Sequence, residues 1–144
     1  MSGTVVLLAA LAAAVLLGVW YQRRNGRFRP AVEPAVDTDV LSAAEIGAPL
    51  GERATLVQFS SAFCAPCRAT RVVLTDVAGL VDGVAAVEVD AESHLDLVRR
   101  LDVMRTPTTF VLDARGAVVT RASGLPTRDQ VVTALAGVPG LSSS

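Results

Sequence analysis

The sequence has few of the residue types from which small proteins build metal sites and disulfide frameworks. Its 144 residues include two cysteines and one histidine, whereas a structural zinc site needs about four ligands. A small secreted domain held together by disulfides would normally contain more cysteines, spread further along the chain. Only two residues separate Cys64 from Cys67, so we interpret the pair as one local site and expect no metal site.

An excess of charge of either sign is also missing. The chain contains 13 Lys and Arg residues and 14 Asp and Glu residues, and its formal net charge is −1. Proteins that bind nucleic acid or strongly acidic substrates usually carry a clear excess of positive charge. We therefore expect no nucleic-acid partner.

Charged residues are absent between Gly3 and Tyr21. A helix of this length spans roughly 28 Å, close to the hydrocarbon thickness of a bilayer. Trp20 and Tyr21, at the end of the segment, are suited to the lipid–water interface. We expect residues 3–21 to be an uncleaved, single-pass anchor in the lipid bilayer. A cleaved signal peptide is the alternative, but the basic start of such peptides is missing.

The residues that flank this segment indicate its orientation. No Lys or Arg precedes it, and four arginines follow it: Arg23, Arg24, Arg27 and Arg29. Positive flanks tend to stay on the cytoplasmic side of the cell membrane. We therefore expect the rest of the chain to be cytoplasmic. An extracytoplasmic position is the alternative, because the charge rule has exceptions.

The remaining chain divides into three parts. Residues 22–37 combine these arginines with prolines and are expected to form an extended linker. Residues 38–137 contain the alternating apolar pattern of one folded domain. Residues 138–144 contain Pro, Gly and a terminal run of Ser, and are expected to be a disordered tail.

Within the domain, strand-length apolar runs alternate with longer helical patterns. Strands are predicted at 55–60, 84–89, 108–112 and 117–120, and helices at 38–46, 66–80, 93–101 and 127–136. Thr127 and Gln130 form a capping box that opens the last helix. Strands separated by helices indicate parallel pairing, and the last two strands, with Gly116 between them, indicate an antiparallel hairpin at the edge. The predicted fold class is α/β, a β-α-β-α-β-β-α mixed sheet with helices on both faces.

The cysteine pair lies at the start of a predicted helix. Cys64 follows the first strand after a short connection, and Pro66 lies in the first turn, where its missing N–H costs nothing. Unpaired N–H groups and the helix dipole at this position stabilise a thiolate over a thiol. Arg68 adds positive charge nearby. Cys67 lies one turn later, close enough to resolve a mixed disulfide formed at Cys64.

Other interpretations of the pair remain. Attachment of haem requires a histidine directly after the second cysteine, where this chain has Arg68. Two inert cysteines in a helical core are a further alternative, which the strand–Cys-Ala-Pro-Cys–helix context disfavours. The single histidine, His94, opens a different helix and is expected to be solvated at the surface.

Two motifs in the sequence resemble a known family. The segment 56–67, LVQFSSAFCAPC, looks like the active-site segment of the thioredoxin superfamily. The segment 105–113, RTPTTFVLD, resembles the second signature of that family, a cis-proline followed by a strand. Gly124 falls where the family has a glycine before its last helix. The resemblance covers roughly residues 50–136 and implies a thioredoxin-like fold.

The resemblance implies a thiol–disulfide oxidoreductase, with Cys64 as the nucleophile and Cys67 as the resolving thiol. Together with the expected anchor at residues 3–21, it predicts a membrane-anchored enzyme. It implies protein thiols and disulfides as substrates, an unidentified electron donor or acceptor, and no cofactor besides the redox-active pair itself. Thr106 and Pro107 would form a cis peptide bond beside Cys64 and offer backbone hydrogen bonds to a bound segment. The other supporting residues would be Gln58, Phe63, Ala65, Pro66 and Gly124.

The sequence departs from the family's pattern at several positions. Phe63 replaces the usual Trp, and Ala65 replaces the usual Gly. Gln58 falls where thioredoxins carry a buried Asp that assists proton transfer to the second cysteine, and Ala86 falls where its partner Lys would be. Glu88 is a candidate for the missing acid, with a partly exposed edge carboxylate as the alternative. With Gln58 in place of the buried Asp, a slower exchange reaction, or one with fewer substrates than that of true thioredoxins, fits the sequence. The second hypothesis is a non-catalytic redox-sensing or partner-binding module at the membrane.

Overall fold

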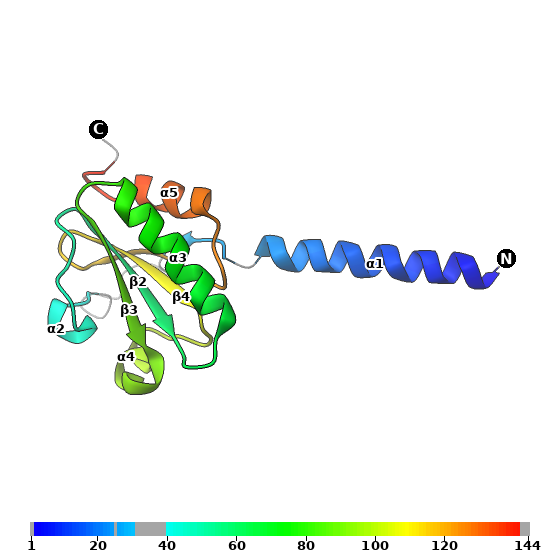
Figure 1. Ribbon diagram of the computed structural model, residues 1–144, viewed down its shortest axis with the longest axis horizontal. Coiled ribbons are helices and arrows are strands. Elements are labelled where there is room, and N and C mark those ends of the chain that lie inside the picture. The colour runs from blue at the N-terminus through cyan, green and yellow to red at the C-terminus, as the bar shows by residue number, and fades with distance from the viewer. Residues whose placement is uncertain (1, 25, 31–39, 142–144) are drawn as a thin grey trace.

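The computed structural model describes residues 2–24, 26–30 and 40–141. It consists of one N-terminal helix and one folded α/β domain (Figure 1). Helix α1 (Ser2–Arg24) buries none of its residues against the domain. It is long and apolar enough to cross a membrane, a property that it shares with signal sequences.

The domain is built on a five-stranded sheet in the order β1-β5-β4-β2-β3. Its strands are β1 (Arg29–Pro30), β2 (Ala54–Ser60), β3 (Val84–Asp90), β4 (Thr108–Asp113) and β5 (Val118–Ser123). β2 and β3 are parallel, and the other neighbours are antiparallel. Every residue of β2 is buried, because a strand between two neighbours with both faces covered meets no water.

Helices cover both faces of this sheet (Figure 1). α3 (Ala65–Leu80) and α5 (Arg128–Ala136) lie on one face, and α2 (Ala43–Ile46) and α4 (Leu95–Arg100) lie on the other, the last after a 3₁₀ turn (Ala91–Ser93). Side chains of β2 alternate between the two faces. Leu56 packs toward α3 and α5, whereas Val57 and Phe59 pack toward α2 and α4.

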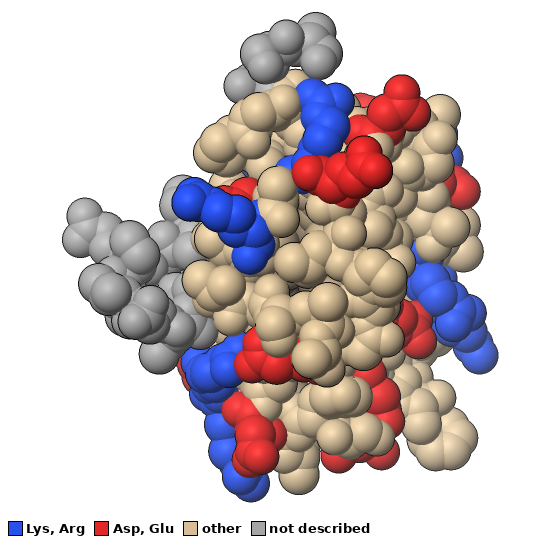
Figure 2. Space-filling view, turned by 90° about the vertical axis from the view of Figure 1, so that its left-hand side faces the viewer, with Lys and Arg blue, Asp and Glu red and all other residues tan. Residues whose placement is uncertain are grey.

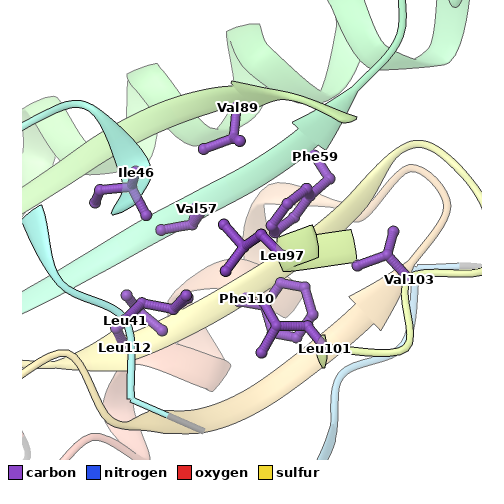
Figure 3. Packing of buried hydrophobic residues seen from close by; sticks show 10 residues of the cluster. All are labelled: Leu41, Ile46, Val57, Phe59, Val89, Leu97, Leu101, Val103, Phe110 and Leu112. Atoms are coloured by element: carbon purple, nitrogen blue, oxygen red, sulfur yellow. The ribbon is translucent and has the colours of Figure 1, made fainter. Parts of the chain in front are cut away.

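Each face has its own apolar cluster. The cluster under α2 and α4 contains ten buried residues (Figure 3): Leu41, Ile46, Val57, Phe59, Val89, Leu97, Leu101, Val103, Phe110 and Leu112. At its centre the rings of Phe59 and Phe110 meet edge to face, with their centroids 5.5 Å apart. The cluster under α3 and α5 contains Leu74, Val131 and Leu135. The two clusters fix both faces of β2 and therefore the start of α3.

The predicted fold class is confirmed, but one strand pairing differs from the prediction. The hairpin β4–β5 does not lie at the edge of the sheet: β4 pairs antiparallel with β2, and β1 pairs with β5. β3 ends beside Ser60, and β4 begins beside Phe59. Because the intervening segment stays at this end of the sheet, β4 runs back along the free edge of β2.

The segment expected to be a linker, residues 22–37, is partly structured. α1 continues to Arg24, and residues 29–30 form β1. Phe28 packs against the cluster under α3 and α5. The sequence prediction relied on the scarcity of apolar side chains, but backbone pairing at a sheet edge does not require them. Residues 31–37 lie outside the described residues.

The segment expected to be a disordered tail, residues 138–144, also begins with ordered residues. Val138 is buried in the cluster under α3 and α5. A guanidinium N–H of Arg53 donates to the carbonyl oxygen of Gly140 at 2.7 Å. Residues 142–144 lie outside the described part of the chain.

Candidate active site

The two cysteines lie at the N-terminus of α3 and are joined by a disulfide. Cys64 is the N-cap residue, and Pro66 lies in the first turn. The backbone N–H of Cys67 donates to Sγ of Cys64 at 3.2 Å, and the two Cα atoms are 5.2 Å apart. Cys64 is half-buried and Cys67 is buried. An approaching molecule can therefore reach Cys64 more easily than Cys67.

The loop that contains Thr106 and Pro107 is tied to the connection that precedes Cys64. The Thr106–Pro107 peptide bond is cis. The hydroxyl oxygens of Ser61 and Thr106 are 3.0 Å apart, within hydrogen-bond distance. On the other side, the N–H of Gly124 donates to the carbonyl oxygen of Pro107 at 2.8 Å. Hydrogen bonds thus connect three segments that are far apart in the sequence, and the role of Ser61 was not predicted.

Gln58 lies beneath the cysteine pair and is 1% exposed. Its amide nitrogen Nε2 donates to the carbonyl oxygen of Cys67 at 2.7 Å. Thr109 is the residue that pairs with Gln58 on the neighbouring strand β4. Among the described residues, Oε1 of Gln58 and Oγ1 of Thr109 have no hydrogen-bond partner. Gln58 therefore fixes the backbone of Cys67 with a neutral amide.

A pocket opens beside both sulfurs and is lined by acidic and basic side chains. Its lining residues include Cys64, Cys67, Arg68, Arg71, Glu88 and Asp90. Glu88 is exposed, and one of its carboxylate oxygens lies 3.6 Å from a guanidinium nitrogen of Arg71. Two hydrogen bonds lower the pKa of Asp90: the larger effect comes from the Ser93 hydroxyl and the smaller from the N–H of Glu92. The pocket thus brings two carboxylates to the side of the site that Cys67 lines.

Three exposed apolar side chains belong to the loops of this site. They are Phe63 (104% exposed), Met104 (83%) and Leu125 (43%). Exposed apolar groups on a protein surface favour the binding of a partner with apolar side chains. Phe63 was expected to support the site, whereas Met104 and Leu125 were not singled out. Their only signal in the sequence is their position next to the two predicted motifs.

Other predicted residues take more peripheral places. Ala65 is exposed in the first turn of α3, and Ala86 is exposed on β3. His94 was expected to be solvated, and it is partly exposed, with Nδ1 2.9 Å from the carbonyl oxygen of Asp90. It lines a different pocket, between α2 and α4, with Glu45. Within the described residues, no three His, Cys, Asp or Glu side chains gather as metal ligands would.

Comparison with known proteins identifies the family. The family model for thioredoxin matches residues 41–137, which is more than half of the chain. The chain belongs to the thioredoxin family. No curated protein matches the chain in a sequence search.

Several solved thioredoxins resemble the domain of this thioredoxin-family chain. A mutant thioredoxin from Halobacterium salinarum is 21% identical, with a TM-score of 0.56 over 62% of this chain and 78% of that one. Thioredoxin-2 of a malaria parasite is 15% identical, with a TM-score of 0.53 over 60% and 84%. Mitochondrial thioredoxin 3 from Saccharomyces cerevisiae is 18% identical, with a TM-score of 0.51 over 58% and 77%. At these identities the likeness shows the fold alone.

Proposed function

We propose that this chain is a membrane-anchored thiol–disulfide oxidoreductase that exchanges its Cys64–Cys67 pair with protein thiols and disulfides. One observation carries the proposal. The half-buried Sγ of Cys64 accepts the N–H of Cys67 at the start of α3. In the reduced protein the same N–H and the helix dipole favour the thiolate, which is the form that attacks a disulfide.

In the reducing direction, the Cys64 thiolate attacks one sulfur of a substrate disulfide. A bond forms between Cys64 and that sulfur, and the other substrate sulfur leaves as a thiolate that takes a proton from water. The Cys67 thiol then loses its proton and attacks Sγ of Cys64. The mixed disulfide breaks, the Cys64–Cys67 disulfide forms, and the second substrate thiol is released. Two electrons pass to the substrate, and the reverse sequence oxidises a dithiol.

The proton of Cys67 needs an acceptor, and Gln58 is neutral. We assign Gln58 the role of a positioning residue, because its Nε2 holds the carbonyl oxygen of Cys67 at 2.7 Å. Glu88 and Asp90 line the pocket that Cys67 also lines. Water in this pocket can carry the proton to Glu88, the carboxylate that we assign as acceptor. Replacing Glu88 with Gln should then slow resolution by Cys67 at neutral pH, whereas Asp90→Asn serves as the matched control.

The membrane part of the proposal depends on α1. Within the described residues no side chain of the domain covers this helix, so lipid is the environment that suits it. The arginines after the span favour a cytoplasmic domain. We therefore propose a single-pass protein of the cell membrane. Substrates and the electron donor or acceptor would be proteins that reach the membrane.

The activity is tested with the full chain in detergent and in membranes. We expect wild type to reduce insulin or a small disulfide in the presence of a dithiol, and Cys64→Ser to have no activity above background. Cys67→Ser should accumulate mixed disulfides with several proteins. Equal rates for wild type and Cys64→Ser across several disulfides would refute the oxidoreductase. Trapping of one partner alone, without turnover, would favour the redox-sensing module.

The anchor is tested separately. Membranes that contain the chain are washed with alkaline carbonate, and the N-terminus of the retained protein is sequenced. We expect the intact N-terminus in the membrane fraction. A soluble protein that begins after the apolar segment would identify a cleaved signal peptide. A reporter fused to the C-terminus then distinguishes the cytoplasmic from the extracytoplasmic side.

A further inference from the structure

The segment that joins α1 to the domain is docked on the sheet beside the candidate active site. We call residues 26–30 the docked segment. The N–H of Gly26 donates to the carbonyl oxygen of Ser123 at 2.7 Å. Phe28 packs against the cluster under α3 and α5, and the last two residues of the segment form β1 against β5. Backbone pairing and a packed aromatic ring thus hold the segment.

The contact at Gly26 requires glycine. Gly26 is buried and has a φ of 75°, a conformation that side chains disfavour. A Cβ atom at this position would lie 2.9 Å from Cα of Pro126 and closer still to the carbonyl group of Leu125. The backbone of the docked segment therefore lies directly against the connection between β5 and α5. A larger residue would lift the segment away from this connection.

The same connection supports the candidate active site. Gly124 directly follows Ser123, and its N–H donates to the carbonyl oxygen of Pro107 at 2.8 Å. Thr106 is in turn within hydrogen-bond distance of Ser61, in the loop that leads to Cys64. The docked segment is therefore linked to the cysteine loop through two backbone hydrogen bonds and one contact between hydroxyl groups. Figure 1 shows α1 leaving the domain on the side where the β5–α5 connection and the start of α3 lie.

Little chain is left to separate the membrane from this side of the domain. α1 ends at Arg24, and two residues of extended chain cover at most about 7 Å before Gly26 is reached. The opposite end of the domain carries basic and acidic side chains (Figure 2), as expected for a face in water. If α1 spans the bilayer, Cys64 cannot move far from the lipid headgroups unless the docked segment is released from the sheet.

We infer that the substrates are proteins whose reactive cysteines lie at the membrane surface, next to a membrane span. This inference rests on the proposed function, since it requires both the anchor and the exchange reaction. The docked segment holds Cys64 near the lipid headgroups, which raises its effective concentration toward thiols at that height. The exposed side chain of Leu125 lies on the connection nearest to the membrane, where an apolar juxtamembrane segment can contact it.

The inference is tested with the full chain reconstituted in vesicles of phosphatidylcholine and phosphatidylglycerol. The probe is a synthetic Leu/Ala transmembrane peptide whose single cysteine carries a chromogenic aryl thiol as a mixed disulfide. The cysteine is placed about 2 or about 16 residues outside the span, on the side of the domain. We expect the near probe to react at least about tenfold faster than the far probe.

A matched variant tests whether the short connection causes this preference. A flexible Gly/Ser linker of about 20 residues is inserted after Arg24, which leaves the docked segment in place. We expect the preference for the near probe to fall to about twofold or less, while the rate with a soluble aryl disulfide stays unchanged. Gly26→Val, which prevents the docked segment from binding to the sheet, should also reduce the preference for the near probe.

The outcomes separate this inference from the proposed function. Equal rates for near and far probes in wild type, or an unchanged preference after the insertion, would overturn the inference. Failure to react even with the soluble disulfide would refute the oxidoreductase instead.

Discussion

α1 and α3 are both long helices with many apolar side chains, but their surroundings are opposite. α3 buries Cys67, Thr70, Leu74 and Val77 against the sheet and exposes most of its other residues. α1 is apolar on all sides and buries nothing among the described residues. A helix that is apolar all round needs either a protein core or lipid around it. The comparison teaches that α3 takes its stability from the sheet, whereas α1 depends on an environment outside the chain.

The two helices also have different roles in the proposed protein. The packing of α3 fixes its N-terminus, and therefore the position of the Cys64 sulfur relative to the Pro107 loop. α1 contributes no group to the pocket beside the sulfurs, but in the proposed arrangement it determines, through the docked segment, how far that pocket lies from the membrane. Substitutions in the two helices should therefore have separable effects.

The same substitution in both helices gives the largest expected contrast. Leu74 is 2% exposed in α3, and Leu74→Ala should lower the free energy of unfolding by about 2–5 kcal/mol, because it leaves a cavity. Leu11→Ala in α1 should leave the unfolding of the domain unchanged. Pulse proteolysis in urea, in detergent, measures both. A similar loss in the two variants would mean that α1 packs against the domain.

A buried charge beneath α3 is the next largest test. Gln58→Asp puts a carboxyl in a site closed to water, and burial raises the pKa of such a group. Its stability relative to wild type should fall as the pH rises from about 4 toward the raised pKa, and the loss at pH 7 should reach about 2–4 kcal/mol. Gln58→Leu, which carries no charge, should show a loss that does not depend on pH. Equal losses for Gln58→Asp at low and neutral pH would mean that water reaches this site.

A charge in α1 tests the other half of the comparison. Leu11→Arg places a guanidinium near the centre of the apolar segment and should make membrane insertion less favourable by about 3–4 kcal/mol. Val72→Arg, on the exposed face of α3, should change the stability of the domain by no more than about 0.5 kcal/mol. Carbonate extraction measures the first effect and urea unfolding the second. Full membrane retention of Leu11→Arg would contradict the assignment of α1 to lipid.

Much of the domain could be predicted because its signals are local. The apolar period of α3, the continuous apolar run of β2 and the spacing of Cys64 and Cys67 each lie within one segment of the sequence. The capping box of Thr127 and Gln130 is present at the start of α5. Local signals of this kind depend on backbone geometry and on the burial of one face, both of which repeat along the chain.

The features that could not be predicted join distant segments. β1 consists of two residues that pair through their backbone, so no side-chain pattern marks it. The contact between Ser61 and Thr106 joins hydroxyls 45 residues apart, and serine and threonine are common at surfaces. The sequence showed that Gln58 replaces a charge, but not that its amide would hold the carbonyl oxygen of Cys67. Long-range hydrogen bonds depend on which segments the fold brings together.

An ion pair at the N-terminus of α2 gives the smallest expected effect. Hydrogen bonds from Arg100 and then from the N–H of Ser42 lower the pKa of Glu45 from its ordinary value of 4.5 to about 2. A lowered pKa stabilises the fold above the ordinary value, and this stabilisation is lost as the pH falls through about 2. Both side chains of the pair are 35% exposed, so screening by water limits its contribution to about 1 kcal/mol.

Glu45→Gln keeps a side chain that can form the capping box and removes only the charge. We expect it to lower the free energy of unfolding by about 1 kcal/mol at pH 7, and this difference should shrink as the pH falls from about 5 to about 2. Glu52→Gln, at an exposed position, is the control and should leave the free energy of unfolding unchanged. If Glu45→Gln destabilised the domain equally at all pH values, the effect would come from packing, and the ion pair of Glu45 with Arg100 would contribute nothing.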